Sequence, residues 1–191
     1  MMRLLFWLTF TLVLPFSAFG EVILEPYLGY ASLKESGSVT ISGIDVDLDE
    51  QSVKGFMPGA RLGLTWKKIA FGIDFSTAEL DVDGTDYRMS NLGAFLMGKF
   101  NKFRIWGGYI FSSKYESSVE VEDINNNILI EDGFIEGSGP KIGFGYHIAR
   151  HFSVNFEWVA LTYDKENFEL LDSIDIKSTG LLLSLGFPFS F

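Results

Sequence analysis

Three residues in the last quarter of the chain have the side-chain types that a hydrolytic site would use. His151, Ser153 and Glu157 lie at odd-numbered positions of one stretch, and alternate residues of a β-strand share a face. A hydroxyl near an imidazole and a carboxylate is the grouping that nucleophilic catalysis uses. The alternative is an interfacial histidine beside ordinary polar residues of an inward face. We favour this alternative and assign no catalytic residue.

Six charged residues also recur at alternate positions of otherwise apolar or glycine-rich stretches. They are Glu25, Arg61, Asp74, Lys99, Lys141 and Glu157. Three acids and three bases on one shared inner face predict an ion-pair network, because buried charges must be paired or solvated. A second hypothesis is a gate whose rearrangement admits ions. We favour a static network that fills the interior, since breaking a buried pair is costly.

Composition limits the other kinds of chemistry. The chain has no cysteine and two histidines, which predicts neither a disulfide nor a zinc site. The acidic run at residues 45–50 lacks the glycine and the terminal glutamate of a calcium-binding loop, so we expect no metal and no cofactor. A net charge of −10 argues against nucleic-acid binding.

Eight segments alternate between apolar and small or polar residues, which predicts β-strands with one apolar face. The segments are Glu21 to Leu33, Gly55 to Trp66, Ile69 to Ala78, Ser90 to Phe100, Phe103 to Lys114, Gly137 to Ile148, Phe152 to Tyr163 and Thr179 to Phe191. Each is long enough for the roughly 9–11 residues that a tilted strand needs to cross a membrane. The apolar faces carry no charge, as exposure to lipid requires.

The connections between these segments alternate between short and long. Short basic turns, such as Lys67-Lys68, alternate with long connections that hold all but four of the acidic residues. This pattern predicts an all-β, eight-stranded, antiparallel up-and-down transmembrane barrel with both ends of the barrel chain on one side. Two long connections contain further alternation, around Ser42-Gly43 and around residues 125–127, and are expected to continue as β-hairpins.

The first twenty residues have the features of a secretory signal peptide. Arg3 precedes an apolar stretch at residues 4–16, and Ala18 and Gly20 are small residues at the positions that signal peptidase prefers. The apolar stretch is too short to span a bilayer of about 30 Å. We therefore expect a signal peptide at residues 1–20 and a barrel domain at residues 21–191.

Three motifs carry a resemblance to a known class of proteins. They are Pro26-Tyr27-Leu28-Gly29-Tyr30, the glycine alternation from Lys141 to Tyr146, and Phe187-Pro188-Phe189-Ser190-Phe191. The chain resembles the small eight-stranded bacterial outer-membrane barrels, namely the OmpA transmembrane domain and the OmpX and OmpW groups. Pro188 departs from the pattern, because proline removes a hydrogen-bond donor from the closing strand.

The resemblance implies a place in the cell and a set of partners. It implies the outer membrane of a Gram-negative-type bacterium, with extracellular loops, periplasmic termini and a monomer surrounded by outer-membrane lipids. It also implies that the barrel-insertion machinery reads the last strand, which ends at Phe191. An aromatic girdle at the periplasmic interface is expected from Trp66, Phe100, Phe103, Phe152, Phe187, Phe189 and Phe191.

The predicted barrel and the resemblance allow three hypotheses for the function. The first is a non-enzymatic structural or surface-interaction role, with a charged plug in the lumen and an extracellular ligand or protein at the acidic loops. The second is a narrow passage for small hydrophobic or ionic solutes, as the OmpW group implies, with Met57, Val159, Leu161 and Leu182 in an apolar upper lumen. The third is modification of lipid A, because lipid A deacylases use a His-x-Ser pair and a glutamate. We favour the first.

Overall fold

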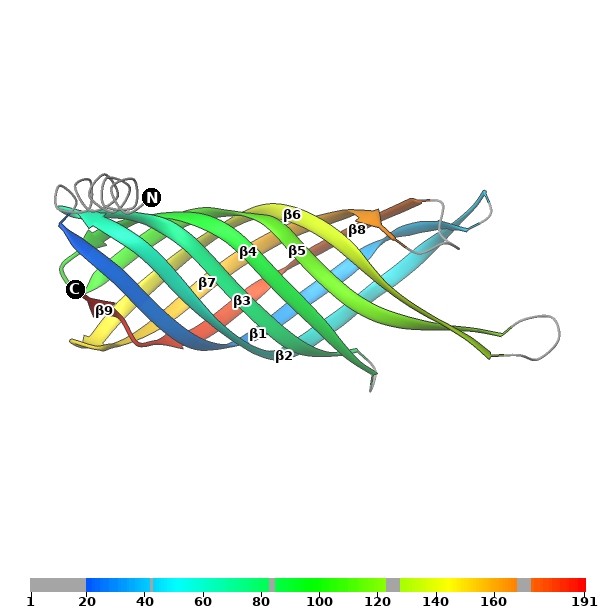
Figure 1. Ribbon diagram of the computed structural model, residues 1–191, viewed down its shortest axis with the longest axis horizontal. Coiled ribbons are helices and arrows are strands. Elements are labelled where there is room, and N and C mark those ends of the chain that lie inside the picture. The colour runs from blue at the N-terminus through cyan, green and yellow to red at the C-terminus, as the bar shows by residue number, and fades with distance from the viewer. Residues whose placement is uncertain (1–19, 42, 83–84, 123–127, 168–172) are drawn as a thin grey trace, which may run out of the picture.

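The computed structural model describes residues 20–41, 43–82, 85–122, 128–167 and 173–191 as β-strands joined by tight connections (Figure 1). The strands are β1 (Glu21–Ile41), β2 (Ile44–Trp66), β3 (Ile69–Val82), β4 (Thr85–Phe100), β5 (Phe103–Glu122), β6 (Ile128–Ala149), β7 (Phe152–Glu166), β8 (Ser173–Gly186) and β9 (Phe189–Ser190). Within these residues no helix has the length and apolarity to cross a membrane. Residues 1–19, most of the predicted signal peptide, lie outside the described residues.

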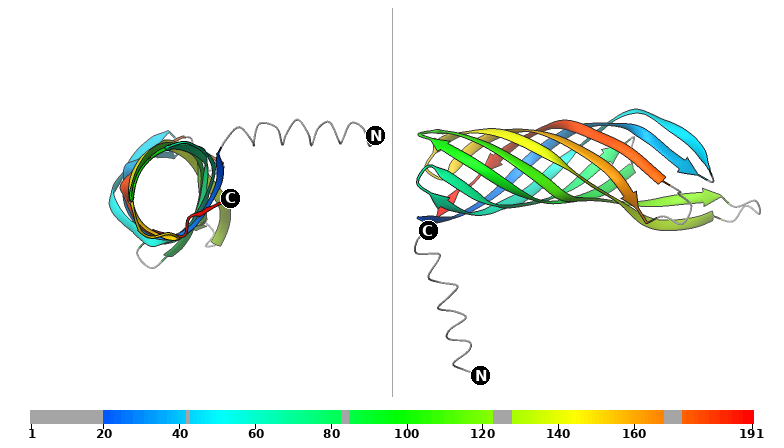
Figure 2. Two further views of the ribbon diagram at one scale, coloured as in Figure 1. Left: turned by 90° about the vertical axis from the view of Figure 1, so that its left-hand side faces the viewer. Right: turned by 90° about the horizontal axis from the view of Figure 1, so that it is seen from above.

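The strands form one closed antiparallel ring (Figure 2). Each strand from β1 to β8 pairs with its neighbours in the sequence, and β1 also pairs with β8. Tyr30 lies opposite Phe56 of β2 on one side and opposite Leu183 of β8 on the other. The predicted eight-stranded up-and-down barrel, closed by its first and last strands, is confirmed.

Pro188 divides the predicted closing strand into β8 and β9 without shifting it. Both segments pair with β1 in one register. Val22 and Phe191 exchange two backbone hydrogen bonds of 3.1 Å, and the Phe187 N–H donates to the Pro26 carbonyl at 2.9 Å. Only alternate residues of an antiparallel strand bond a given partner. Position 188 falls between two bonded positions, so the proline removes no bond to β1.

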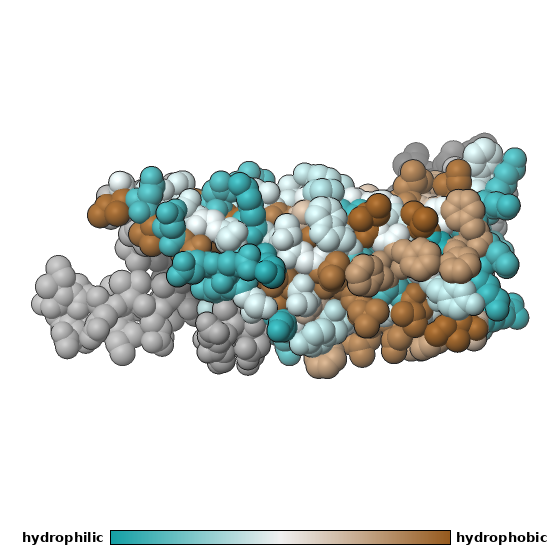
Figure 3. Space-filling view, turned by 180° about the vertical axis from the view of Figure 1, so that it is seen from behind, coloured by the Kyte–Doolittle hydropathy of each residue, from teal (hydrophilic) through white to brown (hydrophobic). Residues whose placement is uncertain are grey.

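The outer surface of the barrel divides into two zones (Figure 3). On the face that Figure 3 shows, the half near the short turns, called the short-turn end, is mainly apolar, and the half near the long connections, called the long-hairpin end, carries most of the hydrophilic residues. The apolar zone consists of outward side chains from all eight strands, among them Leu28, Leu62, Ile73, Leu96, Ile105, Phe144, Trp158 and Leu183. Exposed apolar surface of this extent marks a face that contacts a membrane or another protein, and it has the form of the apolar band of a membrane barrel.

Two hairpins at the long-hairpin end extend well past the apolar zone, as predicted. β1 and β2 remain paired up to Ile41 and Ile44, and β5 and β6 remain paired up to Glu122 and Ile128. Residues 42 and 125–127, where these turns were expected, lie outside the described part of the chain. The strands are therefore longer than the predicted membrane segments, because the alternation of the hairpins continues each strand.

Candidate functional site in the barrel lumen

Six charged side chains from six strands meet inside the barrel. They are Glu25 (β1), Arg61 (β2), Asp74 (β3), Arg104 (β5), Lys141 (β6) and Glu157 (β7). Each is at most 7% exposed, and each lies on the inward face that strand alternation gives it. The ring of eight strands is narrow enough that side chains from opposite walls touch.

Arg61 is the centre of this group. Its Nε donates to Asp74 Oδ2 at 3.1 Å, its Nη1 lies 3.4 Å from Glu25 Oε1, and its Nη2 donates to Glu157 Oε1. Lys141 pairs with Asp74 and lies 3.6 Å from Glu157 Oε2. One guanidinium thus joins three carboxylates from three strands, which ties the walls of the barrel together.

Aromatic rings enclose the Arg61 guanidinium. Its carbon lies 4.7 Å from the centre of the Tyr27 ring and 4.6 Å from that of Trp106. The Tyr27 hydroxyl donates to Asp74 at 2.9 Å, and the Trp106 indole N–H donates to Glu157 at 3.1 Å. The rings therefore stack on the cation while their polar edges satisfy its carboxylate partners.

Arg104 is the base that the sequence prediction missed. It binds Glu25 through both terminal nitrogens, and its Nη2 also donates to Ser153 at 2.9 Å and to Asn155 at 2.7 Å. The signal was present, because Arg104 alternates onto the same face as Trp106 in its strand.

Lys99 is the predicted member that the structure places elsewhere. Its ammonium donates to the Thr65 hydroxyl at 3.2 Å, and the side chain is half-buried near the short-turn end. No ion pair of Lys99 occurs within the described residues. Lys99 lies two residues before a turn, at the mouth of the lumen, where water can solvate its charge. The other five predicted residues are brought together.

An apolar layer covers the charged group on the side of the long-hairpin end. Its buried members include Met57, Leu161 and Leu182, and Val159 packs against it. Between this layer and the charges lies a cavity of about 20 Å³. A space of this size holds about one water molecule. The four residues proposed for an apolar passage thus belong to a packed layer.

Glycines on β6 and β8 make room for the charged group. A Cβ at Gly143 would lie 2.2 Å from the Trp106 ring, and a Cβ at Gly186 would lie 2.3 Å from Glu25 Oε1. Real Cβ atoms do not approach other atoms this closely. The glycine alternation of β6 is therefore a packing requirement of the large side chains opposite it.

Glu35 is a half-buried carboxyl beyond the apolar zone, beside the exposed Lys34. Burial raises its pKa, and the neighbouring Ser178 hydroxyl offsets part of this effect. Burial also raises the pKa of Tyr115, and the negative charge of Glu35 adds to this shift. The charged form of Glu35 is therefore the unfavourable one in the folded protein.

The substitution Glu35→Gln is expected to raise the free energy of unfolding near neutral pH. The folded-state pKa lies above the unfolded value, so the penalty is absent well below the ordinary pKa of 4.5 and grows as the pH rises through it. Urea unfolding in lipid vesicles at several pH values measures this. Glu50→Gln is the control, because Glu50 is exposed and its 2.7 Å pair with Lys34 contributes little. A gain from Glu35→Gln that persists in acid would contradict the assignment.

The residues of the predicted aromatic girdle lie at the short-turn end, beside the turns or in the closing segment. Trp66, Phe100, Phe103, Phe187, Phe189 and Phe191 are exposed, and Phe152 is half-buried. The Phe152 and Phe187 rings are 5.7 Å apart. Their role as an interfacial girdle stays a prediction.

The three residues with hydrolytic side chains are separated by their own contacts. Ser153 is fully buried, where it accepts a hydrogen bond from Arg104 and lies 3.3 Å from the Gly186 carbonyl. The His151 ring is exposed, stacks on Phe189 and lies 3.1 Å from the Pro188 carbonyl. The Glu157 carboxylate forms ion pairs with the buried Arg61 and Lys141. Within the described residues, no group of three potential metal ligands occurs either.

Comparison with known proteins shows likeness in structure. No family model and no curated protein matches the sequence. Neisserial surface protein A (NspA) superposes with a TM-score of 0.52 at 15% identity, over 89% of this chain and 99% of its own. Ail of Yersinia pestis superposes with a TM-score of 0.53 at 12% identity, over 90% and 99%. Ail in complex with the heparin analogue sucrose octasulfate gives 0.52 at 13% identity, over 89% and 100%.

At these identities the likeness concerns the fold, and it covers almost the whole length of each chain. It agrees with the closed ring of antiparallel strands described above. The chain has the fold of the small eight-stranded outer-membrane β-barrels of Gram-negative-type bacteria.

Proposed function

We propose that this protein is a sealed, non-enzymatic barrel of the bacterial outer membrane that presents acidic hairpins outside the cell. One observation supports the sealed state: the paired charges fill the lumen, and an apolar layer covers them. The cavity between the charges and this layer is about 20 Å³. The apolar outer zone supports the membrane location. In this orientation the short-turn end and both ends of the barrel chain face the periplasm, since such barrels have short periplasmic turns and long extracellular loops.

The acidic rim formed by the β1–β2 hairpin supports an interaction role. Asp45, Asp47 and Asp49 alternate along β2 and are exposed. Along this part of β2 one edge is open within the described residues, because β3 pairs with β2 only from Lys54. An open edge can accept an additional strand, and its acidic side chains favour a cationic one. The rim would repel a polyanion such as the sucrose octasulfate seen with Ail.

The triple substitution Asp45→Asn, Asp47→Asn and Asp49→Asn is expected to weaken binding of an extended Lys-Val alternating peptide about tenfold. Three exposed charges at about 0.5 kcal/mol each give this factor. Thermophoresis of the detergent-solubilised protein at low salt measures it. Lys34→Gln, which makes the same hairpin more acidic, should preserve or tighten binding. Equal affinity of the triple variant and the wild type would contradict a charge-based rim.

The other two functions receive less support. A passage for small solutes needs a continuous lumen, whereas the charged group and the apolar layer leave a cavity of about 20 Å³ between them. A hydrolytic site needs an accessible nucleophile beside its base, whereas Ser153 is buried and hydrogen-bonded to Arg104. Both observations support the sealed, non-enzymatic proposal.

A further inference from the structure

A hollow of about 90 Å³ lies on the β1–β2 hairpin beyond the apolar zone, and we call it the Glu35 hollow. Its lining residues are Glu35, Ser36, Leu48, Asp49, Gln51 and Ile176, from β1, β2 and β8. A space of this size holds several water-sized groups, so the end of a long side chain can enter it. The hollow shares no lining residue with the small cavity of the lumen.

A β-bulge in the hairpin shapes the Glu35 hollow. The pairing of β1 with β2 shifts at Ser36, which has two residues of β2 opposite it, Asp49 and Glu50. Bulges redirect side chains and are common beside functional sites. Asp49 thereby lines the same hollow as its neighbour Leu48, although strict alternation would place the two on opposite faces of the sheet.

The charges of the Glu35 hollow are not balanced. The carboxylates of Glu35 and Asp49 belong to its lining, and no base does. The nearest base in the sequence, Lys34, pairs with the exposed Glu50 at 2.7 Å. Glu35 Oε1 is buried and has no hydrogen-bond partner among the described residues. A buried acceptor without a donor is destabilising, so a donor from outside would relieve a penalty that the free protein carries.

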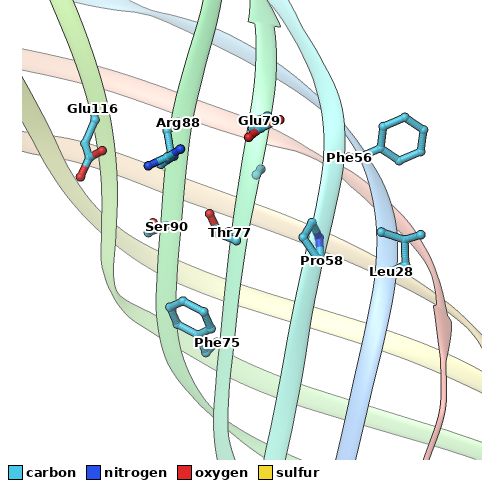
Figure 4. Close-up of a pocket in the computed structure, with 10 residues that line it drawn as sticks. Leu28, Phe56, Pro58, Phe75, Thr77, Glu79, Arg88, Ser90 and Glu116 are labelled. Carbon is cyan, nitrogen blue, oxygen red and sulfur yellow. The ribbon is translucent and has the colours of Figure 1, made fainter.

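A larger hollow of about 670 Å³ on the outer wall differs in this respect (Figure 4). There Arg88 of β4 lies between Glu79 of β3 and Glu116 of β5, its direct cross-strand neighbours. The acids of the outer-wall hollow thus have a base beside them, whereas those of the Glu35 hollow have none. Charge complementarity therefore favours a cationic occupant for the Glu35 hollow.

The remaining lining favours a lysine side chain. Leu48 and Ile176 offer an apolar wall to a hydrocarbon stem whose charged end meets the carboxylates. The edge of β2 is open beside the hollow, because β3 pairs with β2 only from Lys54. A strand added at this edge would lie two strand spacings, about 10 Å, from β1. The four-carbon stem of lysine can cross β2 and bring three donors to Glu35, whereas a short side chain ends at Leu48.

We propose that the Glu35 hollow binds one lysine side chain of an extended cationic segment that adds to β2. This inference rests on the proposed role of the acidic rim and adds a position to it. Lysines on the outward side of the segment meet Asp45 and Asp47, and a single lysine among apolar residues on the inward side enters the hollow. The hollow thus fixes the register of the segment, because one inward position lies beside it.

The test is thermophoresis of the detergent-solubilised protein at low salt with two kinds of peptide. The first is the Lys-Val alternating peptide, whose lysines share one face. The second is a series in which one valine of that peptide is replaced by lysine, at each valine position in turn. The wild type is expected to bind one member of the series about tenfold more tightly than the first peptide, the gain from one charged hydrogen-bonded contact.

Glu35→Gln is expected to remove this tenfold gain and to leave binding of the first peptide unchanged. Its fold is not at risk, because loss of the unfavourable charge is expected to stabilise the protein. Asp49→Asn should reduce the gain, since Asp49 lines the same hollow. Glu79→Gln is the matched control: it removes one exposed carboxylate from the outer-wall hollow and should preserve the gain.

Equal affinity for every member of the series would overturn the lysine pocket, as would a gain that persists in Glu35→Gln. A gain that Glu79→Gln also removes would overturn it as well, because overall negative charge would then explain the binding. These results leave the acidic rim intact as long as the first peptide binds. Failure of all the peptides to bind would instead contradict the acidic rim itself.

Discussion

Replacement of Arg61 by methionine is expected to lower the free energy of unfolding in lipid by about 3–5 kcal/mol, the typical result of breaking a buried ion pair. Arg61 is 1% exposed and contacts three carboxylates. Without it, Glu25, Asp74 and Glu157 share only two bases, and one buried negative charge is left uncompensated. Methionine retains much of the side-chain volume, so the effect reports the lost charge more than a cavity.

Urea unfolding in lipid vesicles, followed by tryptophan fluorescence, measures this difference. Trp106 lies against Arg61 and reports directly on the site. Lys102→Met is the control, since Lys102 is an exposed residue of a short turn, where a substitution changes stability by about 0.5 kcal/mol or less. A loss below about 1 kcal/mol for Arg61→Met would show that the network contributes little to stability.

The substitution Gly143→Ala is expected to cost about 3 kcal/mol, although it adds one methyl group. The new Cβ would lie 2.2 Å from the Trp106 ring. That ring cannot move away easily, because it stacks on Arg61 and donates to Glu157. The urea concentration at the midpoint of unfolding is therefore expected to fall, and the Trp106 fluorescence emission of the folded state is expected to change.

Gly107→Ala provides a matched control for this substitution. Gly107 belongs to the neighbouring strand β5, and no atom lies within 4 Å of the Cβ that alanine would add. The control should fold as stably as the wild type or slightly more so, since alanine reduces the freedom of the unfolded chain. Equal losses at the two positions would mean that glycine is needed for backbone freedom and not for room at Trp106.

The fold could be predicted because a membrane barrel imposes a simple rule on every strand. Outward residues must be apolar, and each predicted segment from Glu21 to Phe191 places apolar residues at alternate positions. The order of short and long connections then fixes the topology. The same rule explains why NspA and Ail share the fold at 15% and 12% identity: it constrains the class of residue at a position and not its identity.

The ion-pair network could be predicted only in part. Alternation gives the face of a residue but not its depth along the barrel, so Lys99 was included although it lies at the mouth. Arg104 was left out although its alternation with Trp106 already placed it on the inward face; the sequence does not show, however, which carboxylate it meets across the lumen. The close contact between Arg104 and Glu25 depends on the narrow ring and on the register of all eight strands.

Pro188 and Glu35 show two further limits. The sequence indicates that a proline interrupts the closing strand, but its effect depends on whether its position bonds to β1, and only the register decides this. Glu35 lies in a connection that was expected to be a solvated hairpin. It is half-buried because the β1–β2 hairpin continues the inward face of the barrel beyond the apolar zone, where its side chain meets Ser178 of β8.

Single-channel recording of the purified protein in a planar lipid bilayer tests the sealed lumen most directly. The wild type is expected to insert without steady conductance steps, since paired charges and the apolar layer above them leave no continuous water path. Steady channels in the wild type that disappear in Arg61→Ala or Glu157→Ala would contradict this account, because the charged side chains would then line a conducting pathway.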